Sequence, residues 1–265
     1  MTKPSRSETA LPEKAFCYHL LGGTNISLGR FAQSVFYEEE ELALTRKLGN
    51  KRTEANALNS LGEAWRMMGD GEKAIAKYNE ALKIAREIGN KNSEIMILSN
   101  IGGALVISGD YEKAENHLNK TIELIGDSGH FILAETFQFL AEALFKQNKN
   151  AEALKAATKS LELSQKAEEQ IVTANAWRVL GLIAANSGEN LTINDESQTA
   201  VKCFENALQI VSETKMEAEI ARTLREFSRY ENKLENSEKA RKMLDEAKEI
   251  FTRLEMPLEI ERCSD

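Results

Sequence analysis

The chain has few of the residues that interrupt helices. Its 265 residues include only three prolines, and aromatic residues make up 6%. Ala, Leu, Glu and Lys are abundant, whereas runs of Val, Ile and Thr with the two-residue period of a strand are missing. This composition favours long helices and gives strands little support.

Cysteine and long apolar runs are also scarce. Cys17, Cys203 and Cys263 are odd in number, lie far apart and form no CxxC pair, which indicates reduced thiols and a cytoplasmic protein. No apolar run approaches transmembrane length, and the N-terminal stretch MTKPSRSETALPEK lacks the apolar core of a signal peptide. The net charge of −8 argues against bulk attraction to nucleic acid or an anionic membrane.

Reactive side chains do not converge along the sequence. His19, His117 and His130 are isolated, with no HExxH and no pair at metal-ligand spacing. The glycine pairs at 22–23 and 102–103 belong to no GxxxxGK[ST] phosphate-binding loop. We therefore expect no enzymatic activity, no catalytic residue, no metal site and no cofactor.

The sequence contains an internal repeat with a spacing of forty residues. The segment LTRKLGNKRTEANALNSLG at 44–62 returns as IAREIGNKNSEIMILSNIG at 84–102. The same frame extends over nearly the whole chain. It predicts six units near 14–52, 53–92, 93–131, 132–171, 172–216 and 217–254, between a flexible tail at 1–13 and a C-terminal segment at 255–265.

Each unit has the apolar periodicity of two amphipathic helices. The stretches GDGEKA at 69–74 and GDYEKA at 109–114 separate the helices within a unit. Their glycines are expected to end one helix in the left-handed conformation, and their aspartates to cap the next. The GNK stretches at 49–51 and 89–91 do the same between units, where Thr53 or Ser93 is expected to start the following helix.

Small residues recur where paired helices must approach closely. Gly62, Gly102 and Gly181 are expected on the first helix of their pairs, with large apolar residues opposite them at Tyr78, Leu118 and Phe204. The accompanying small residues of the second helices are Ala74, Ala114, Ala153, Ala200 and Ala240. The first unit fits more loosely and places Gly22, Ser34 and Glu38 at these positions.

This pattern resembles the tetratricopeptide repeat. Leu61, Gly62, Trp65, Ala74, Tyr78 and Ala81 match most of its signature, and Trp177, Leu180 and Gly181 match its opening. The resemblance implies an all-α, right-handed superhelical solenoid of about six helix–turn–helix units. The repeat is longer than the usual 34 residues, and in this it is similar to repeats of kinesin light chains, spindle-orientation scaffolds, bacterial peptide-sensing regulators, signalling ATPases, cyclases and caspase-like proteases.

The chain departs from the family pattern in three places. The typical proline near the repeat end is missing, and the first and last units are degenerate, as expected for units that cap a stack. The stretch ENLTINDESQ at 189–198 interrupts the fifth unit, and its Asn, Asp and Ser content predicts a surface loop. This loop is either a tolerated extension or a contact for one specific partner.

The resemblance further implies that the first helices line a concave surface that holds a peptide or a partner helix. Residues spaced by 3, 4 and 3 away from the Leu-Gly stripe give Phe16, His19, Gly23 and Ile26 in the first unit. The residues we predict to bind the partner, including asparagines similar to those that hold peptide backbones in related scaffolds, are Asn56, Asn59, Glu63, Arg66, Met96, Asn100, Val106, Gln138, Phe145, Asn175, Arg178, Leu182, Arg222, Arg225 and Arg229. Asn59 and Asn100 occupy different repeat positions, so only one of these two is expected to face the groove.

Arginines at the C-terminal end and apolar residues in the middle of this surface predict an acidic peptide with apolar anchors. Two alternatives stay open. The arginines pair instead with Glu219, Glu226 or Glu231 of their own helix, or the apolar residues pack against the next unit or under the C-terminal segment.

The sequence as a whole predicts a non-catalytic adaptor or scaffold in the cytoplasm, with a protein or peptide partner and no nucleic acid or membrane partner. The alternatives are a bacterial peptide-sensing regulator, or the regulatory subunit of a caspase-like protease or signalling ATPase. Exposed faces of the terminal helices leave self-association open.

Overall fold

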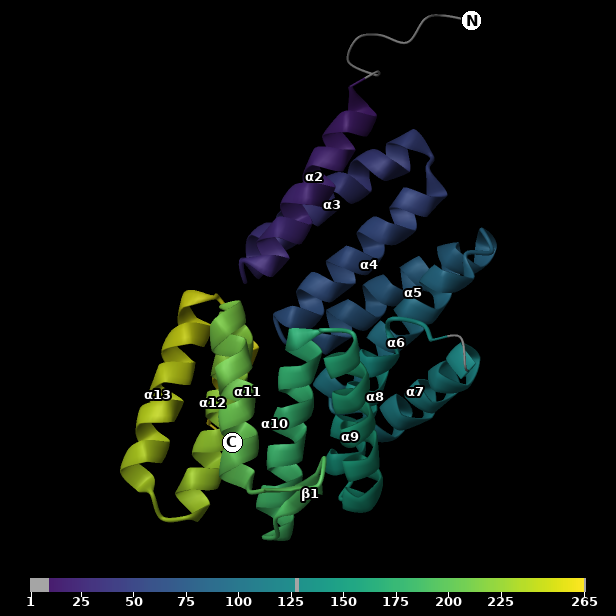
Figure 1. Cartoon of the computed structure of the whole chain (residues 1–265). Helices are drawn as coiled ribbons and strands as arrows, with labels where there is room; N and C mark the ends of the chain where they lie inside the picture. Colours follow the sequence, from purple (N-terminus) through teal and green to yellow (C-terminus); the bar gives the residue numbers. More distant parts are fainter. Residues whose placement is uncertain (1–9, 127–128, 265) are drawn as a thin grey trace, which may run out of the picture. The chain divides into compact units, whose positions relative to one another are not determined.

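Helices make up nearly all of the described chain, which in this computed structural model comprises residues 10–126 and 129–264. Within residues 11–107, and again within residues 111–253, consecutive helices lie side by side as antiparallel neighbours (Figure 1). The predicted all-α class is confirmed. The helices are α2 (Leu11–Ser27), α3 (Phe31–Leu48), α4 (Lys51–Met67), α5 (Gly71–Glu87), α6 (Lys91–Ile107), α7 (Tyr111–Ile125), α8 (Leu133–Lys146), α9 (Asn150–Lys166), α10 (Gln170–Ser187), α11 (Ala200–Thr214), α12 (Glu217–Lys233), α13 (Ser237–Arg253) and α14 (Pro257–Glu261).

The chain forms two compact units, residues 1–108 and 109–265. In the first unit each helix from α2 to α5 contacts its successor, and α4 also contacts α2 and α6. In the second unit each helix from α7 to α14 contacts its successor, and α10 also contacts α8 and α12. Within each unit the helices therefore stack in chain order with the first helices of successive pairs adjacent, as the predicted repeat architecture requires. The exact repeat boundaries stay a prediction.

Glycine turns and side-chain caps separate the helices, largely as the sequence predicts. Gly49, Gly69, Gly89 and Gly109 all have a left-handed backbone with φ between 68° and 86°. Asp70 Oδ1 accepts a hydrogen bond from the Lys73 backbone N–H at 3.0 Å, which caps α5. Asp110, in contrast, caps no backbone N–H of α7 and binds Lys113 Nζ at 2.9 Å.

The predicted starts of α4 and α6 are wrong by three residues. Asn50 Oδ1 accepts from the Thr53 backbone N–H at 3.3 Å, and Asn90 Oδ1 accepts from Ser93 N–H at 3.2 Å. An asparagine at the cap satisfies an N–H of the first turn that has no helical partner. Thr53 and Ser93 therefore lie inside the helices, and the asparagines of the GNK stretches start them.

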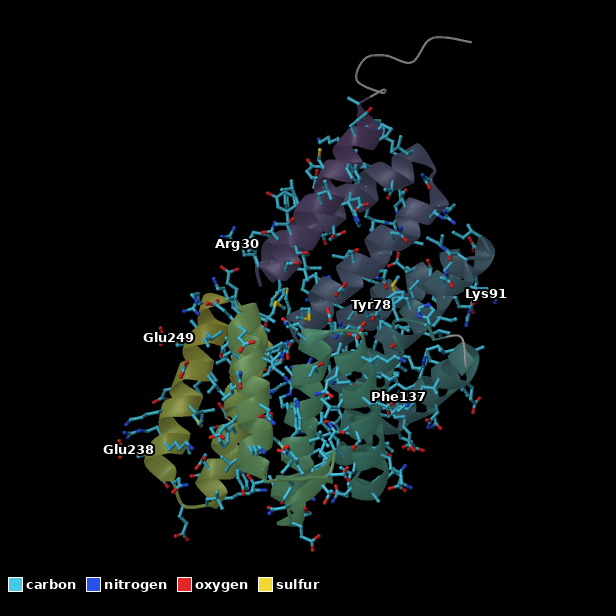
Figure 2. The ribbon with its side chains drawn as sticks, in the orientation of Figure 1. Arg30, Tyr78, Lys91, Phe137, Glu238 and Glu249 are labelled. Atoms are coloured by element: carbon cyan, nitrogen blue, oxygen red, sulfur yellow. The ribbon has the colours of Figure 1, made fainter. Side chains whose placement is uncertain are left out.

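The predicted close approach between paired helices is present. Tyr78, labelled in Figure 2, is fully buried, and a Cβ added at Gly62 would lie 2.6 Å from its Cε1. A Cβ added at Gly181 would lie 3.0 Å from the ring of the equally buried Phe204. Charged side chains such as Glu238 point away from the ribbon. Each glycine thus makes room for a large side chain of the second helix.

The insertion at 189–198 forms a β-hairpin, which corrects the prediction of a plain surface loop. Strand β1 (Leu191–Ile193) pairs antiparallel with β2 (Glu196–Gln198). Asn194 and Asp195 both have positive φ, of 51° and 64°, as a two-residue hairpin turn requires. Leu191 and Ile193 are buried while Thr192 is exposed. Pairing with β2 and burial of Leu191 and Ile193 together stabilise this short strand.

The chain ends also differ from the prediction. Residues 1–9 of the predicted tail lie outside the described residues, but α2 begins at Leu11, with Pro12 in the first turn where a missing N–H has no cost. The C-terminal segment carries α14, whose preceding residue Met256 is fully buried.

The structure also bears on the predicted thiols and on the predicted lack of a transmembrane helix. All three cysteines are free thiols, with Cys17 exposed and Cys203 and Cys263 buried. Among the described residues, every helix is too short or too polar to traverse a lipid bilayer.

The glycine packing generates a stability prediction. Gly62→Ala should lower the free energy of unfolding by about 1–3 kcal/mol, because the buried Tyr78 ring cannot move without strain. Gly23→Ala in α2 is the matched control: a Cβ there meets no atom within 4 Å, so it should raise stability by roughly 0.5–1 kcal/mol through helix propensity. Urea unfolding measures both, and shifts of the same sign would contradict the packing argument.

Candidate functional site

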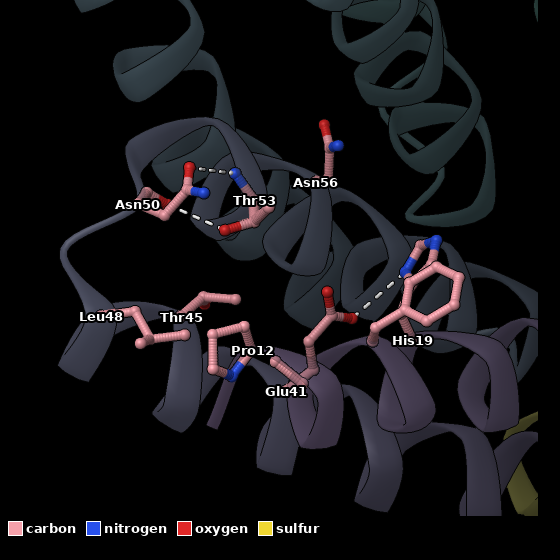
Figure 3. A pocket seen from close by; sticks show the side chains of 10 residues that line it. Pro12, His19, Glu41, Thr45, Leu48, Asn50, Thr53 and Asn56 are labelled. Atoms are coloured by element: carbon pink, nitrogen blue, oxygen red, sulfur yellow. Dashed lines mark hydrogen bonds and ion pairs between the residues drawn. The ribbon is translucent and has the colours of Figure 1, made fainter. Parts of the chain in front are cut away.

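A pocket opens in the first unit between α2, α3 and α4. Its volume is about 160 Å³. Pro12, Ala15, Phe16 and Leu48 supply apolar walls, and His19, Glu41, Thr45, Asn50, Thr53 and Asn56 supply polar groups (Figure 3). Phe16, His19 and Asn56 all come from the predicted partner-binding face of the first helices. Three residues that the sequence assigned to that face therefore line one recessed pocket.

One wall of the pocket carries interacting ionisable groups. His19 Nδ1 lies 3.2 Å from Glu41 Oε2, as the dashed line in Figure 3 shows. Next to them is Glu38, whose side chain is fully buried and whose two carboxylate oxygens have no hydrogen-bond donor. Burial raises the pKa of Glu38 to about 9, and the nearby Glu41 carboxylate adds to the shift.

The sequence does contain one sign that Glu38 is unusual, although it matches no motif of metal-ligand or catalytic spacing. Glu38 occupies the repeat position at which Tyr78, Leu118 and Phe204 fill the space above the first helix. A carboxylate at a core position is costly unless something balances its charge. His19 and Glu41 are 22 residues apart, so only the packing of α2 on α3 brings them together.

Two of the predicted asparagines bind each other. Asn100 Nδ2 of α6 donates to Asn59 Oδ1 of α4 at 3.0 Å, and both side chains are buried. Neither side chain is exposed, although one of the two was expected to face the groove. The bond supplies each buried amide with a polar partner. Asn56 is exposed at the pocket, and Met96 is half-buried while Val106 is buried.

The remaining predicted residues, apart from the four arginines of the second unit, are mostly half-buried. In the first unit these are Glu63 and Arg66, and in the second they are Phe145, Asn175 and Leu182. Gln138 is buried, and its Nε2 donates to Glu142 Oε2 at 3.3 Å. The structure leaves these side chains partly accessible and does not join them into one cluster.

Four of the five predicted arginines, Arg178, Arg222, Arg225 and Arg229, do converge in the second unit, but on carboxylates of the same chain. Arg178 Nη1 donates to Glu219 Oε2 at 2.8 Å, and Arg222 also binds Glu219. Arg222 Nε donates to Glu259 Oε1 at 3.1 Å. Arg225 binds Glu259 as well. Arg178, Arg222 and Arg225 are each at most 9% exposed.

The cluster continues toward solvent through Arg229. Its Nη1 donates to Glu226 Oε1 at 2.9 Å, and its Nη2 donates to the Arg262 carbonyl oxygen at 2.6 Å. Pairing with Glu219 and Glu226 was one of the alternatives that the sequence left open. Glu259, which comes from α14, was not predicted. The expected availability of Arg178, Arg222 and Arg225 is thereby corrected, because buried guanidinium groups need acceptors from their own chain.

These contacts set the charge state of the buried carboxylates. Burial by itself raises the pKa of Glu259, but the positive charges of Arg222, Arg225 and Arg262 outweigh it and lower the pKa to about 2. Burial likewise raises the pKa of Glu219, but the positive charges of Arg222 and Arg178 outweigh it and lower the pKa to about 2. Both groups are therefore ionised in the folded protein at neutral pH.

A sequence model of the tetratricopeptide repeat matches residues 53–125. The helix pairs and the packing of aromatic rings against glycines are what this repeat requires, so the structure and the match support the same family. Residues 53–125 therefore consist of tetratricopeptide repeats. No curated protein matches its sequence significantly.

Solved structures share the fold of this repeat protein across most of its length. The apo form of RapI is 19% identical over 92% of this chain and 85% of that chain, with a TM-score of 0.72. A Rap protein complexed with Competence and Sporulation Factor is 14% identical over 95% and 73%, with a TM-score of 0.68. The Rap conjugation gene regulator of plasmid pLS20, in complex with the Phr* peptide, is 14% identical over 98% and 67%, with a TM-score of 0.73.

The arginine cluster generates a mutational prediction. Glu259→Gln should destabilise the repeat protein by about 3–5 kcal/mol, because it leaves Arg222 and Arg225 buried without their shared counter-charge. Glu261→Gln, an exposed change in the same helix, should stay within about 0.5 kcal/mol of the parent. Chemical denaturation followed by circular dichroism measures both, and equal effects would contradict a buried ion cluster.

The cluster also predicts acid sensitivity. The folded-state pKa values of Glu219 and Glu259 are about 2, below their ordinary value of 4.5. The two carboxylates therefore stabilise the folded state fully above pH 4.5, and this contribution is lost as the pH falls toward 2. The free energy of unfolding should decline below about pH 5, and Glu259→Gln should decline less steeply. If the free energy of unfolding of the parent and of Glu259→Gln fell equally steeply with pH, Glu259 would not be a source of the acid sensitivity.

Proposed function

We propose that this chain is a non-catalytic interaction module that holds a peptide or helix of a partner protein on the face of its first helices. The observation that carries the proposal is the pocket between α2, α3 and α4, which lies on that face and combines apolar walls with polar groups. Peptide-bound relatives of the same fold add support, since two of the similar structures are complexes with a named factor or peptide. A cytoplasmic location remains a prediction.

The size of the pocket suits one side chain. At about 160 Å³ it is smaller than the roughly 300–1,000 Å³ of sites that enclose a small molecule. Phe16 is 61% exposed at this pocket and offers a large apolar surface to an incoming residue. An apolar anchor of a peptide or helix would bury this surface, which is how a few residues come to dominate an interface.

Hydrogen-bonding groups adjoin the apolar walls. The exposed Asn56 side chain offers an acceptor and two donors, and it lies on the first helix of its pair. A peptide backbone carries the complementary groups at every residue. Asn56 would therefore orient the backbone, while the neighbouring apolar walls accept a side chain.

We still propose an acidic partner, but its carboxylates would contact only the exposed part of the arginine cluster. Five guanidinium groups of the second unit, those of Arg178, Arg222, Arg225, Arg229 and Arg262, face three carboxylates, those of Glu219, Glu226 and Glu259. The Arg229 side chain is 37% exposed, so a partner carboxylate would approach Arg229 and not the buried arginines.

A peptide-responsive regulator is the second candidate, favoured by the peptide complexes among the similar structures. Purification from the native host followed by mass spectrometry separates the candidates. A protein in equal stoichiometry supports an adaptor, whereas a tightly held short peptide supports a sensor.

The pocket generates a binding prediction. Peptides selected from a displayed library against the full chain should lose affinity on Phe16→Ala by about thirtyfold, the effect of a hot spot worth about 2 kcal/mol. Phe36→Ala is the matched control, because Phe36 is similarly exposed, at 56%, but does not line the pocket. Fluorescence anisotropy measures the affinities. A loss with Phe36→Ala but not with Phe16→Ala would reject this pocket as the anchor site.

A further inference from the structure

The first helix pair has a polar centre where the other pairs have an apolar one. Glu38 of α3 packs over Gly22 of α2, just as Tyr78 packs over Gly62. A Cβ at position 22 would collide with the Glu38 carboxylate, so the glycine reserves the space that this carboxylate occupies. The acidic group is therefore held at the centre of the pair and is not a surface residue that happens to be covered.

Three side chains converge at this centre. Each of His19, Glu38 and Glu41 places a potential ligand atom so that the three atoms lie within 4.8 Å of one another. Within residues 10–126 and 129–264, this is the group of His, Cys, Asp and Glu side chains whose geometry suits a metal ion. Glu38 is fully buried, and both its oxygens lack a hydrogen-bond donor.

We propose that His19, Glu38 and Glu41 form a binding site for a divalent first-row transition ion of the Zn²⁺ type. One imidazole and two carboxylates are ligands that zinc accepts, at about 2.0–2.2 Å each. Two such ligands on a tetrahedral ion stand about 3.4 Å apart. The His19 Nδ1 and Glu41 Oε2 atoms are already 3.2 Å apart.

The surroundings complete the site. His19 is 44% exposed and, with Glu41, lines the pocket, so a fourth coordination position faces the pocket and leaves room for water. The ion would also supply the positive charge that two adjacent, largely buried carboxylates need. The arrangement that competes with the ion is a proton shared between Glu38 and Glu41, and the experiment must distinguish the two. The proposal does not depend on peptide binding.

The test uses the full chain, free of any affinity tag, stripped with chelator and titrated with ZnCl₂ in a calorimeter. We expect one ion per chain, with affinity reduced at least about tenfold in His19→Gln and in Glu38→Gln. His130→Gln is the matched control, since His130 lies outside the cluster, and it should bind as the parent does. Titration with CoCl₂ should give visible absorption bands in the parent and weaker ones in both ligand variants.

Thermal unfolding gives an independent readout. Zn²⁺ should raise the Tm of the parent and raise that of Glu38→Gln clearly less at the same concentration, because the ion stabilises the folded state in proportion to its affinity for the site. Gln keeps the shape of Glu and removes its charge, so this variant retains the packing; Glu41→Gln serves if it fails to fold. Absence of one-to-one binding by the parent would overturn the proposal in favour of a shared proton. Unchanged binding by both His19→Gln and Glu38→Gln would overturn it as well, by placing the ion elsewhere. No peptide is present, so failure of the pocket as a peptide site leaves these outcomes unaffected.

Discussion

Close approach of paired helices is the constraint on which the rest of this structure depends. A glycine on the first helix leaves the space that a large residue of the second helix fills, as Tyr78 does over Gly62 and Phe204 over Gly181. An interior packed at this density has no room for an added methyl group without strain. The first helices of successive pairs then come into contact with one another, and this creates the face on which the pocket lies.

The same constraint explains why the first pair differs in chemistry while it keeps the geometry. Glu38 takes the place of the aromatic residue, and Ser34 takes the place of the alanine one turn earlier. Both positions are fully buried, and the Ser34 hydroxyl, like the Glu38 carboxylate, has no hydrogen-bond partner. Polar groups are expensive in such a place, so their presence marks a centre whose role differs from packing.

In the second unit, unlike at Glu38, the buried charged groups are paired with groups of opposite charge. Arg178, Arg222 and Arg225 are surrounded by carboxylates from α12 and α14, so each buried charge has a counter-charge within hydrogen-bonding distance. Such a cluster contributes little net stability against an apolar core of the same volume, but it is strongly destabilising to break. It thus attaches the C-terminal helix α14 to α12 through specific geometry as well as apolar contact.

The sequence by itself determined the helices, their turns and the glycine–aromatic contacts, because these are local or recur at a fixed interval that periodicity reveals. It singled out Asn56, which lines the pocket of the first unit, and four arginines that come together in the second unit. It missed the β-hairpin at 189–198, since three-residue strands depend on a partner strand and on burial of Leu191 and Ile193.

Only the tertiary structure decided how charged side chains are used. Glu259 lies 34 residues beyond Arg225, and Glu41 lies 22 residues beyond His19, so no spacing rule links them. Whether an arginine faces a partner or a carboxylate of its own chain depends on which helix packs over it. That choice follows from long-range packing and desolvation, which a one-dimensional pattern does not contain.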